Sequence, residues 1–145
     1  LLKKLGVEPL SNDFTIDYLQ KNINRRSKCI KNFLMDQSII AGIGNIYASE
    51  ILYRAKVHPL RSVDSLNKEN LKNIIKSTKY ILKKSINVGG TSIKNHLQPD
   101  GKLGYFVQKL QVYGKPKQKC TKCNDLIKKK IINNRATYFC NTCQK

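Results

Sequence analysis

The sequence predicts a mainly α-helical fold that is followed by a small metal-binding β-hairpin. Two observations favour this class. Residues 1–88 carry apolar side chains at helical spacing, and residues 120–143 contain two Cys-x-x-Cys pairs. Since 40% of the residues are hydrophobic, the chain can bury a core, and no apolar run is long enough to cross a membrane.

The first part of the helical region is expected to form two helices. Apolar residues recur at roughly helical spacing over residues 13–23, and the turn-forming segment 9–12 precedes them. Ser27 is a candidate cap for a shorter second helix, with Ile30, Phe33 and Leu34 facing inward. Cys29 lies among residues that also favour a helix, so it is interpreted as a small buried hydrophobe.

Two longer helices are expected in the second part. One covers residues 46–56 and buries one face. The other begins after Asn67, a candidate N-cap, with Leu66 and Leu71 as a hydrophobic staple. The glycine pair 89–90 is expected to end that helix.

A long loop and a hairpin are expected after the helices. Residues 89–109 are loop-like, and a loop of this length is usually functional or disordered. Residues 110–113 alternate like a β-strand that leads into the hairpin. Apolar residues on both sides of the turn-forming pair Asn133-Asn134 predict the two hairpin strands.

The four cysteines of the hairpin region have the spacing of a zinc site. Two Cys-x-x-Cys pairs, separated by sixteen residues, are formed by Cys120, Cys123, Cys140 and Cys143. A hairpin of this size is marginal in water, so a bound metal would supply folding energy. Two disulfides or a redox pair are the alternatives, which a lysine-rich chain without a secretory leader favours less. We expect one structural zinc ion, because four thiolates leave no open coordination position.

The charge of the chain points to a polyanionic partner. The formal net charge is +19 and the pI is near 9.9, which favours nucleic acid first and an anionic membrane surface second. Most of the basic residues are Lys, and an AT-rich genome could raise the lysine count. Codon bias does not explain the shortage of acids, so nucleic acid remains the preferred partner.

Two residues are candidates for binding phosphate. Asn45 follows Gly42-Ile43-Gly44 at a predicted helix start, where free N–H groups and the helix dipole favour an anion. A glycine turn between two packed helices is the alternative. Arg135 lies beside the predicted hairpin turn, where its forked guanidinium suits phosphate, although it could be a solvated loop residue. The lysines around it give the hairpin a positive surface that suits a nucleic-acid backbone.

No residue pair in the chain predicts a nucleophile with its base. Glu50 is interpreted as a structural residue that favours the dipole of its own helix. His58 and His96 have no Ser, Cys or carboxylate partner nearby in the sequence, so neither is assigned a catalytic role.

Six short motifs occur along the chain in a recognisable order. They are Leu34-Met35-Asp36-Gln37, the segment Gly42–Glu50, His58-Pro59, Gly89-Gly90-Thr91, Val112-Tyr113-Gly114 and the segment Asn134–Cys140. Together they resemble the C-terminal half of the bacterial formamidopyrimidine-DNA glycosylases, over essentially the whole chain. The resemblance implies a helix-two-turns-helix domain over residues 1–110, with a lesion-capping loop at 89–105, and a zinc finger over residues 111–145.

The resemblance also implies a function in base-excision DNA repair. The family removes oxidised purines, such as 8-oxoguanine and formamidopyrimidines, from duplex DNA and then cuts the backbone as an AP lyase. Arg26, Lys31 and Asn45 would bind phosphate beside the lesion. Arg135 would grip phosphate from the hairpin tip and take part in the final elimination step. The implied partners are damaged or abasic duplex DNA and an N-terminal catalytic domain, with the protein a monomer in the bacterial cytoplasm, at the nucleoid and not in a membrane.

Some features depart from the family pattern. The family's N-terminal proline nucleophile, the glutamate beside it and the β-domain lysine are not in the sequence. Because the chain opens at Leu1 with neither Met nor a leader, we expect a piece of a longer protein that binds zinc and DNA but cleaves nothing alone. Lys115 stands where Arg is usual.

Two rival functions are considered. One is an endonuclease VIII-like enzyme that excises oxidised pyrimidines, although Gly-Gly-Thr-Ser and Val-Tyr-Gly favour the purine enzyme. The other is a non-enzymatic zinc ribbon that binds RNA or a ribosome through exposed aromatic residues.

Overall fold

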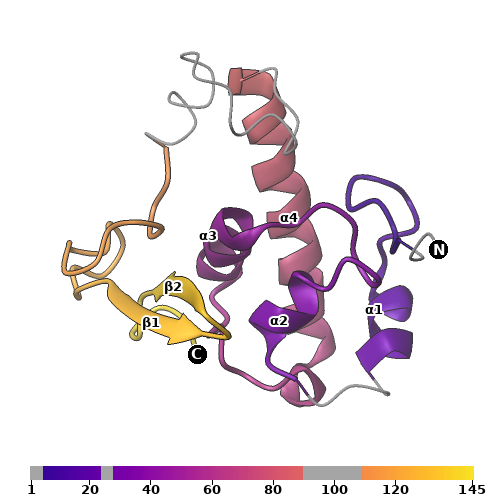
Figure 1. Ribbon diagram of the computed structural model, residues 1–145, viewed down its shortest axis with the longest axis horizontal. Helices are drawn as coiled ribbons and strands as arrows, with labels where there is room; N and C mark the ends of the chain where they lie inside the picture. Colours follow the sequence, from indigo (N-terminus) through magenta and orange to yellow (C-terminus); the bar gives the residue numbers. More distant parts are fainter. Residues whose placement is uncertain (1–4, 24–27, 90–108) are drawn as a thin grey trace.

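The computed structural model describes residues 5–23, 28–89 and 109–145. Its elements are, in chain order, α1 (Ile16–Ile23), α2 (Ile30–Leu34), α3 (Asn45–Ala55), the 3₁₀ turn η1 (Val63–Ser65), α4 (Lys68–Gly89), β1 (Lys128–Ile132) and β2 (Arg135–Phe139). The long α4 packs against α1 and α3, and α3 lies between α4 and the hairpin (Figure 1). This confirms the mainly α fold with a terminal hairpin.

Several sequence predictions fall on residues outside these ranges. They concern Arg26, Ser27, His96 and the loop 89–105 beyond Gly89. Within the described ranges, no helix is both long and apolar enough to cross a bilayer.

Two hydrophobic clusters share α3 as a common wall. The main cluster gathers Phe14, Phe33, Ile51, Leu52 and Leu71 with other buried side chains of the four helices. The second, smaller cluster lies under the hairpin and contains Tyr53, Val112, Cys120, Ile127, Tyr138 and Cys140. Neighbouring residues of α3 therefore pack into different clusters, and burial on both sides ties the hairpin to the helices.

The start of α4 is capped as the sequence predicts. Asn67 Oδ1 accepts a hydrogen bond from the backbone N–H of Asn70 at 2.8 Å, and Asn70 Oδ1 accepts one from the N–H of Asn67 at 3.0 Å. This reciprocal pair is a capping box, because two N–H groups without helical partners are satisfied at once. Leu71 is buried and Leu66 packs partly buried against the same core, as the predicted staple requires.

Two helix starts differ from the prediction. The first helix begins at Ile16 rather than Asp13, because Thr15 Oγ1 accepts a hydrogen bond from the N–H of Tyr18 at 3.1 Å. The N–H of Asp13 is instead held in a turn by Ser11 Oγ at 3.2 Å. Cys29 is partly buried and extended, with φ −72° and ψ 155°, so it precedes α2 rather than lying in it.

The segment before α1 packs closely on the chain that follows α2. Val7 forms a parallel bridge with Ile40, and the N–H of Gly6 donates to the carbonyl of Gln37 at 2.8 Å. A Cβ on Gly6 would lie 2.1 Å from the carbonyl carbon of Ile39. This contact leaves no room for a side chain, so glycine is required here.

The strand predicted at residues 110–113 does not form. The backbone N–H groups of Gln111, Val112 and Tyr113 all donate to the carboxylate of Glu50, at 2.8, 2.9 and 2.8 Å. In a strand, successive N–H groups point to opposite sides, so three in a row cannot reach one carboxylate. The buried carboxylate therefore turns this segment, and Gly114, at φ +73°, continues the turn.

Candidate nucleic-acid interface and metal centre

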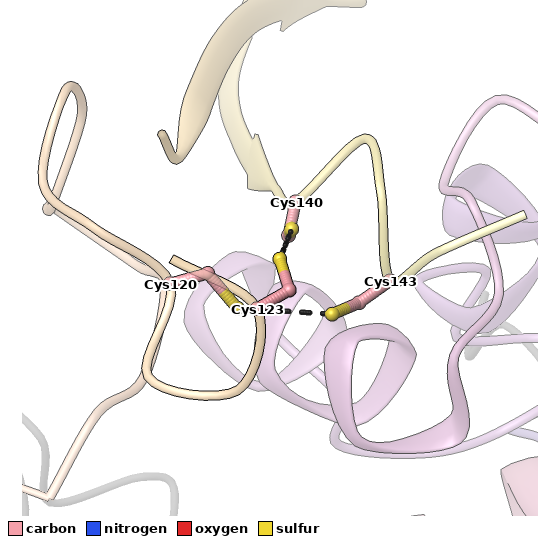
Figure 2. A group of neighbouring side chains, drawn as sticks. All are labelled: Cys120, Cys123, Cys140 and Cys143. Carbon is pink, nitrogen blue, oxygen red and sulfur yellow. Dashed lines mark hydrogen bonds between the residues drawn. The ribbon is translucent and has the colours of Figure 1, made fainter. Parts of the chain in front are cut away.

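Four cysteine sulfurs converge beneath the hairpin (Figure 2). All four lie within 4.8 Å of one another, with Sγ–Sγ distances of 3.8 Å for Cys120–Cys143 and 3.4 Å for Cys123–Cys140. A zinc ion with four bonds of about 2.3 Å in tetrahedral geometry sets sulfurs about 3.8 Å apart. The cysteines are free thiols gathered round one point, so the donor set fits one metal ion better than two disulfides.

Neighbouring groups favour the thiolate form of Cys120. The Tyr53 hydroxyl lies 3.1 Å from Cys120 Sγ, and the N–H of Lys122 lies 3.4 Å from it. Burial raises the pKa of the Cys120 thiol, but these hydrogen bonds, with two from Cys123, outweigh it and bring the pKa to about 6. Burial instead raises the pKa of Cys140 and raises that of Cys143 to about 12, so the protein groups alone favour the thiolate form at Cys120 and not at these two ligands.

The second cysteine knuckle is attached to the end of α3. Gln144 is buried, its Oε1 accepts a hydrogen bond from the N–H of Cys140 at 2.8 Å, and its Nε2 donates to the carbonyl of Val57 at 3.0 Å. The N–H of Lys145 donates to the carbonyl of Lys56. The position of the metal centre relative to the helices is therefore set by direct hydrogen bonds.

A glycine turn presents Asn45 at the first position of α3. Gly42 has φ +88°, and its N–H donates to Gln37 Oε1 at 2.7 Å. Gln37 Nε2 also donates to the carbonyl of Ile43 at 3.2 Å, so one side chain holds both sides of the turn. The N-cap residue is Gly44, which has no side chain that could cap the helix. Asn45 is therefore the first side chain at this end of α3.

The Asn45 side chain connects α3 to the hairpin. Its Nδ2 donates to the carbonyl of Ala136 at 2.9 Å and lies 3.4 Å from the hydroxyl of Tyr113. Its Oδ1 is buried without a hydrogen-bond partner in the structure. A buried acceptor without a partner is costly, so Asn45 occupies a position that a packing role alone does not explain.

Lys31 of α2 contacts Thr137, the residue of β2 that follows Ala136. The side chain is only 1% exposed, and its Nζ donates to Thr137 Oγ1 at 2.5 Å. The pKa of Lys31 is lowered to about 8, mainly because the amine is buried; Cys29 raises it and the Arg135 charge lowers it, each to a smaller extent. Asn45 and Lys31 thus hold consecutive residues of β2.

Arg135 is the first residue of β2 and is exposed to solvent. It follows a two-residue turn in which Asn133 and Asn134 both have positive φ, 49° and 64°, as a type I′ hairpin turn requires. It pairs with Ile132 across the hairpin, which confirms the predicted turn. It directly precedes Ala136 and Thr137, the two residues of β2 that Asn45 and Lys31 contact.

The structure thus brings three of the predicted phosphate-binding residues to one junction. Lys31, Asn45 and Arg135 come from α2, α3 and β2, whereas Arg26 lies outside the described residues. The adjacent strand β1 adds three exposed lysines, at positions 128–130. We call Lys31, Asn45, Arg135 and the lysines at positions 128–130 the basic junction. None of these residues carries a carboxylate, so they do not neutralise one another's positive charge.

The structure gives partners to Glu50 and His58, neither of which was assigned a catalytic role from the sequence. Glu50 does not cap its own helix; it is 5% exposed, and burial raises its pKa although the three backbone N–H groups act in the opposite direction. The ring of His58 lies 4.6 Å from that of Phe139, and its Nδ1 accepts a hydrogen bond from the N–H of Leu60. Both groups link α3 and the residues after it to the hairpin.

Three supporting residues were not identified from the sequence. Tyr113 contacts Asn45 and packs edge-on against Tyr138, with ring centroids 4.8 Å apart. Its place in Val-Tyr-Gly was the available signal. Thr137 lies within the motif Asn134–Cys140, which was its only sequence signal, whereas Tyr53 carries none; each acts through a partner more than 65 residues away.

The described helices and the four-cysteine hairpin that follows them fit a helix-two-turns-helix domain with a zinc-finger hairpin. The "Formamidopyrimidine-DNA glycosylase H2TH domain" matches residues 5–96 of this chain. The chain belongs to this family.

Curated relatives and solved structures agree with this assignment. The chain is 47% identical to the formamidopyrimidine-DNA glycosylase of Haemophilus ducreyi, over 99% of this chain and 53% of that protein. It resembles Lactococcus lactis Fpg in complex with abasic-site DNA, with a TM-score of 0.84, 34% identity, and 97% and 52% coverage. For MutM (Fpg) of Thermus thermophilus the TM-score is 0.86, at 34% identity and 97% and 54% coverage. The chain therefore spans about half the length of the relatives it matches.

Proposed function

We propose that this chain is the DNA-binding half of a DNA glycosylase and AP lyase that acts on oxidised purines in duplex DNA. The observation that carries the proposal is the basic junction, where Lys31, Asn45 and Arg135 converge from three elements. Lysine and arginine side chains bind phosphate oxygens, and an asparagine at a helix N-terminus adds a donor where the dipole favours an anion. The relatives named as formamidopyrimidine-DNA glycosylases, one solved with abasic-site DNA, support the substrate class.

In this proposal the three residues bind phosphates on both sides of a flipped nucleotide. Base flipping costs a few kcal/mol of unstacking, and clamping the backbone on a bent duplex offsets that cost. Arg26 contributes a further phosphate contact, and Arg135 takes part in the final elimination. The segment 89–105 closes over the lesion, within a DNA-binding domain over residues 1–110 that precedes a zinc finger over 111–145.

The metal in this proposal is one structural zinc ion bound by the four cysteines. Four thiolates complete a tetrahedral shell, so the ion stabilises the hairpin and takes no part in the chemistry. The support is the convergence of the sulfurs and the hydrogen bonds that stabilise the Cys120 thiolate. The place of action that follows is the bacterial cytoplasm, at the nucleoid, as a monomer on duplex DNA.

The reaction itself needs a nucleophile that these residues do not offer. We infer that the chain alone binds damaged DNA without cleaving it, and that an N-terminal domain of the kind in its relatives supplies the chemistry. Incubation with a duplex that contains an abasic site, with borohydride present to trap any Schiff base, should give no covalent adduct. Strand cleavage or a trapped adduct would contradict this inference.

A chimera tests the activity directly. The N-terminal half of the Haemophilus ducreyi relative would be joined to this chain and incubated with duplexes that carry formamidopyrimidine, 8-oxoguanine or an oxidised pyrimidine. Excision of the purine lesions, lost in the Arg135→Ala chimera, is expected. Excision of the oxidised pyrimidine alone would favour the endonuclease VIII-like function instead.

A further inference from the structure

A cavity of about 250 Å³ lies outside the basic junction, between α3, α4 and the segment that follows residue 108. These two helices run side by side in Figure 1. The residues that decide its chemistry are Arg54, Tyr80, Ile81, Lys84, Leu110 and Lys122.

The floor of this cavity is apolar. Ile81 and Leu110 are 9% and 6% exposed and belong to the main core. Tyr80, by contrast, is 44% exposed, although it is a large aromatic residue on a well-packed helix. Burying such a ring against a partner removes apolar surface from water, which is favourable.

The rim of the cavity is positively charged. The Arg54 guanidinium lies 3.5 Å from the centroid of the Tyr80 ring, and Lys84 Nζ lies 5.6 Å from the same ring. Lys122 Nζ lies 5.7 Å from the ring of Tyr53. Cation–π contacts orient these side chains in advance, so less conformational entropy is lost when an anion binds.

The one carboxylate among the described lining residues does not neutralise this rim. Both oxygens of Glu50 accept hydrogen bonds from the backbone N–H groups of residues 111–113. Among the residues that the structure describes, Glu50 therefore does not pair with the cations of the rim, and a carboxylate from a partner is the group that complements them.

The cavity faces away from the basic junction. Arg54 follows Asn45 by nine residues of the same helix, which places the two side chains about 180° apart around α3 and about 13 Å apart along it. A duplex bound at the basic junction therefore leaves Arg54 and its neighbours uncovered.

We propose that this cavity binds an acidic peptide segment that carries one large apolar side chain. The carboxylates of the peptide pair with Arg54, Lys84 and Lys122, and its apolar side chain packs on Tyr80, Ile81 and Leu110. A nucleic-acid backbone would use the charges but leave the exposed part of the Tyr80 ring in water. A membrane surface is too flat to enter the cavity. An acidic peptide with one large apolar side chain complements both the positive rim and the apolar surface of the cavity.

The test is fluorescence anisotropy with the zinc-loaded chain and a labelled Asp/Glu-rich peptide of about ten residues with one central Phe, long enough to span a cavity of this size. We expect saturable binding with one peptide per chain. Replacing the Phe of the peptide with Ser should weaken binding about tenfold. The chain variant Arg54→Glu/Lys84→Glu should weaken it by at least about tenfold, with the helical circular dichroism unchanged.

A matched control separates this site from the general positive charge of the chain. Lys76→Glu/Lys83→Glu makes the same charge change at two exposed positions of α4 that do not line the cavity. It should change the affinity by less than about threefold. Equal losses in both variants, or no loss with the Ser peptide, would overturn the proposal. A third result would also overturn it: undamaged duplex DNA displaces the peptide, and Arg54→Glu/Lys84→Glu no longer binds that DNA. The cavity would then be part of the DNA-binding surface.

Discussion

Lys31 in α2 and Thr137 in β2 are 106 residues apart in the sequence, yet the lysine amine donates a hydrogen bond to the threonine hydroxyl. One residue earlier in β2, the carbonyl of Ala136 accepts a hydrogen bond from Asn45 at the start of α3. The residues proposed to bind phosphate are thus also the residues that hold the hairpin on the helices. Phosphate binding and hairpin docking are expected to depend on each other.

The lowered pKa of Lys31 predicts a pH dependence of DNA binding. Only the protonated amine attracts phosphate, and the pKa is about 8, so affinity for an abasic duplex should fall as the pH rises from 7 to 9.5. The free energy of unfolding should instead increase as the pH rises. Because the unfolded chain keeps its proton up to the ordinary value of 10.5, this group's contribution to the free energy of unfolding rises between pH 8 and 10.5.

The measurement is a set of binding isotherms at pH 7, 8 and 9 for the wild type and Lys31→Met. The variant should bind about tenfold more weakly at pH 7, as for the loss of a strong phosphate contact, and should show a flat profile. Lys129→Met, at an exposed position of β1, should keep the wild-type slope. A slope that persists in Lys31→Met would contradict the assignment to this amine.

The carboxylate of Glu50 is predicted to hold the segment that leads into the hairpin. Glu50→Gln leaves one acceptor oxygen for three backbone N–H groups and removes the charge, so the free energy of unfolding should fall by about 2–3 kcal/mol. Urea denaturation measures this change. Glu69→Gln, at an exposed position in the first turn of α4, should cost less than about 1 kcal/mol. Similar losses in both variants would show that the buried hydrogen bonds contribute little.

Removal of the metal is predicted to unfold the hairpin and spare the helices. The hairpin cluster is small and is built partly from Cys120 and Cys140, whereas the main cluster contains no metal ligand. Chelation should therefore abolish binding to abasic DNA while most of the helical circular dichroism remains. Elemental analysis should give one zinc ion per chain before chelation. Full binding by the metal-free chain would contradict the structural role of zinc.

Two glycines are predicted to respond differently to substitution by alanine. At Gly6 the new Cβ would lie 2.1 Å from backbone atoms of Ile39, so Gly6→Ala should destabilise the fold by about 1–3 kcal/mol. At Gly44 nothing lies within 4 Å of the new Cβ, and φ is −96°. Gly44→Ala should leave the melting temperature nearly unchanged. Thermal melts of both variants decide the point, and equal melting temperatures would contradict the close contact at Gly6.

Local patterns predicted much of this fold. The cap of α4 at Asn67 and the Asn133-Asn134 turn each depend on residues close in sequence, and each is confirmed. The prediction of a strand at residues 110–113 was wrong because the conformation of this segment depends on a residue that is distant in the sequence. Its backbone partner is Glu50, about 60 residues earlier, and a buried carboxylate overrides an alternating pattern.

The same distinction applies to the site. The four cysteines could be grouped from spacing alone, because each pair lies within one turn of chain. The convergence of Lys31, Asn45 and Arg135 depends on contacts across about 90 to 106 residues, which composition and periodicity do not contain. The role of Lys31 came from the family resemblance alone, whereas Asn45 and Arg135 were also candidates from the predicted helix start and hairpin turn. The structure adds the hydrogen bonds by which Lys31 and Asn45 reach β2 beside Arg135.

The central claim is that the basic junction recognises damaged DNA through Asn45 and Arg135. The most direct test is the affinity of the zinc-loaded chain for duplexes with and without an abasic-site analogue, over a series of salt concentrations. We expect tighter, salt-dependent binding to the abasic duplex, about tenfold weaker in both Asn45→Ala and Arg135→Ala, with a shallower salt slope for Arg135→Ala. Binding that is indifferent to the abasic site and to both substitutions would contradict the claim.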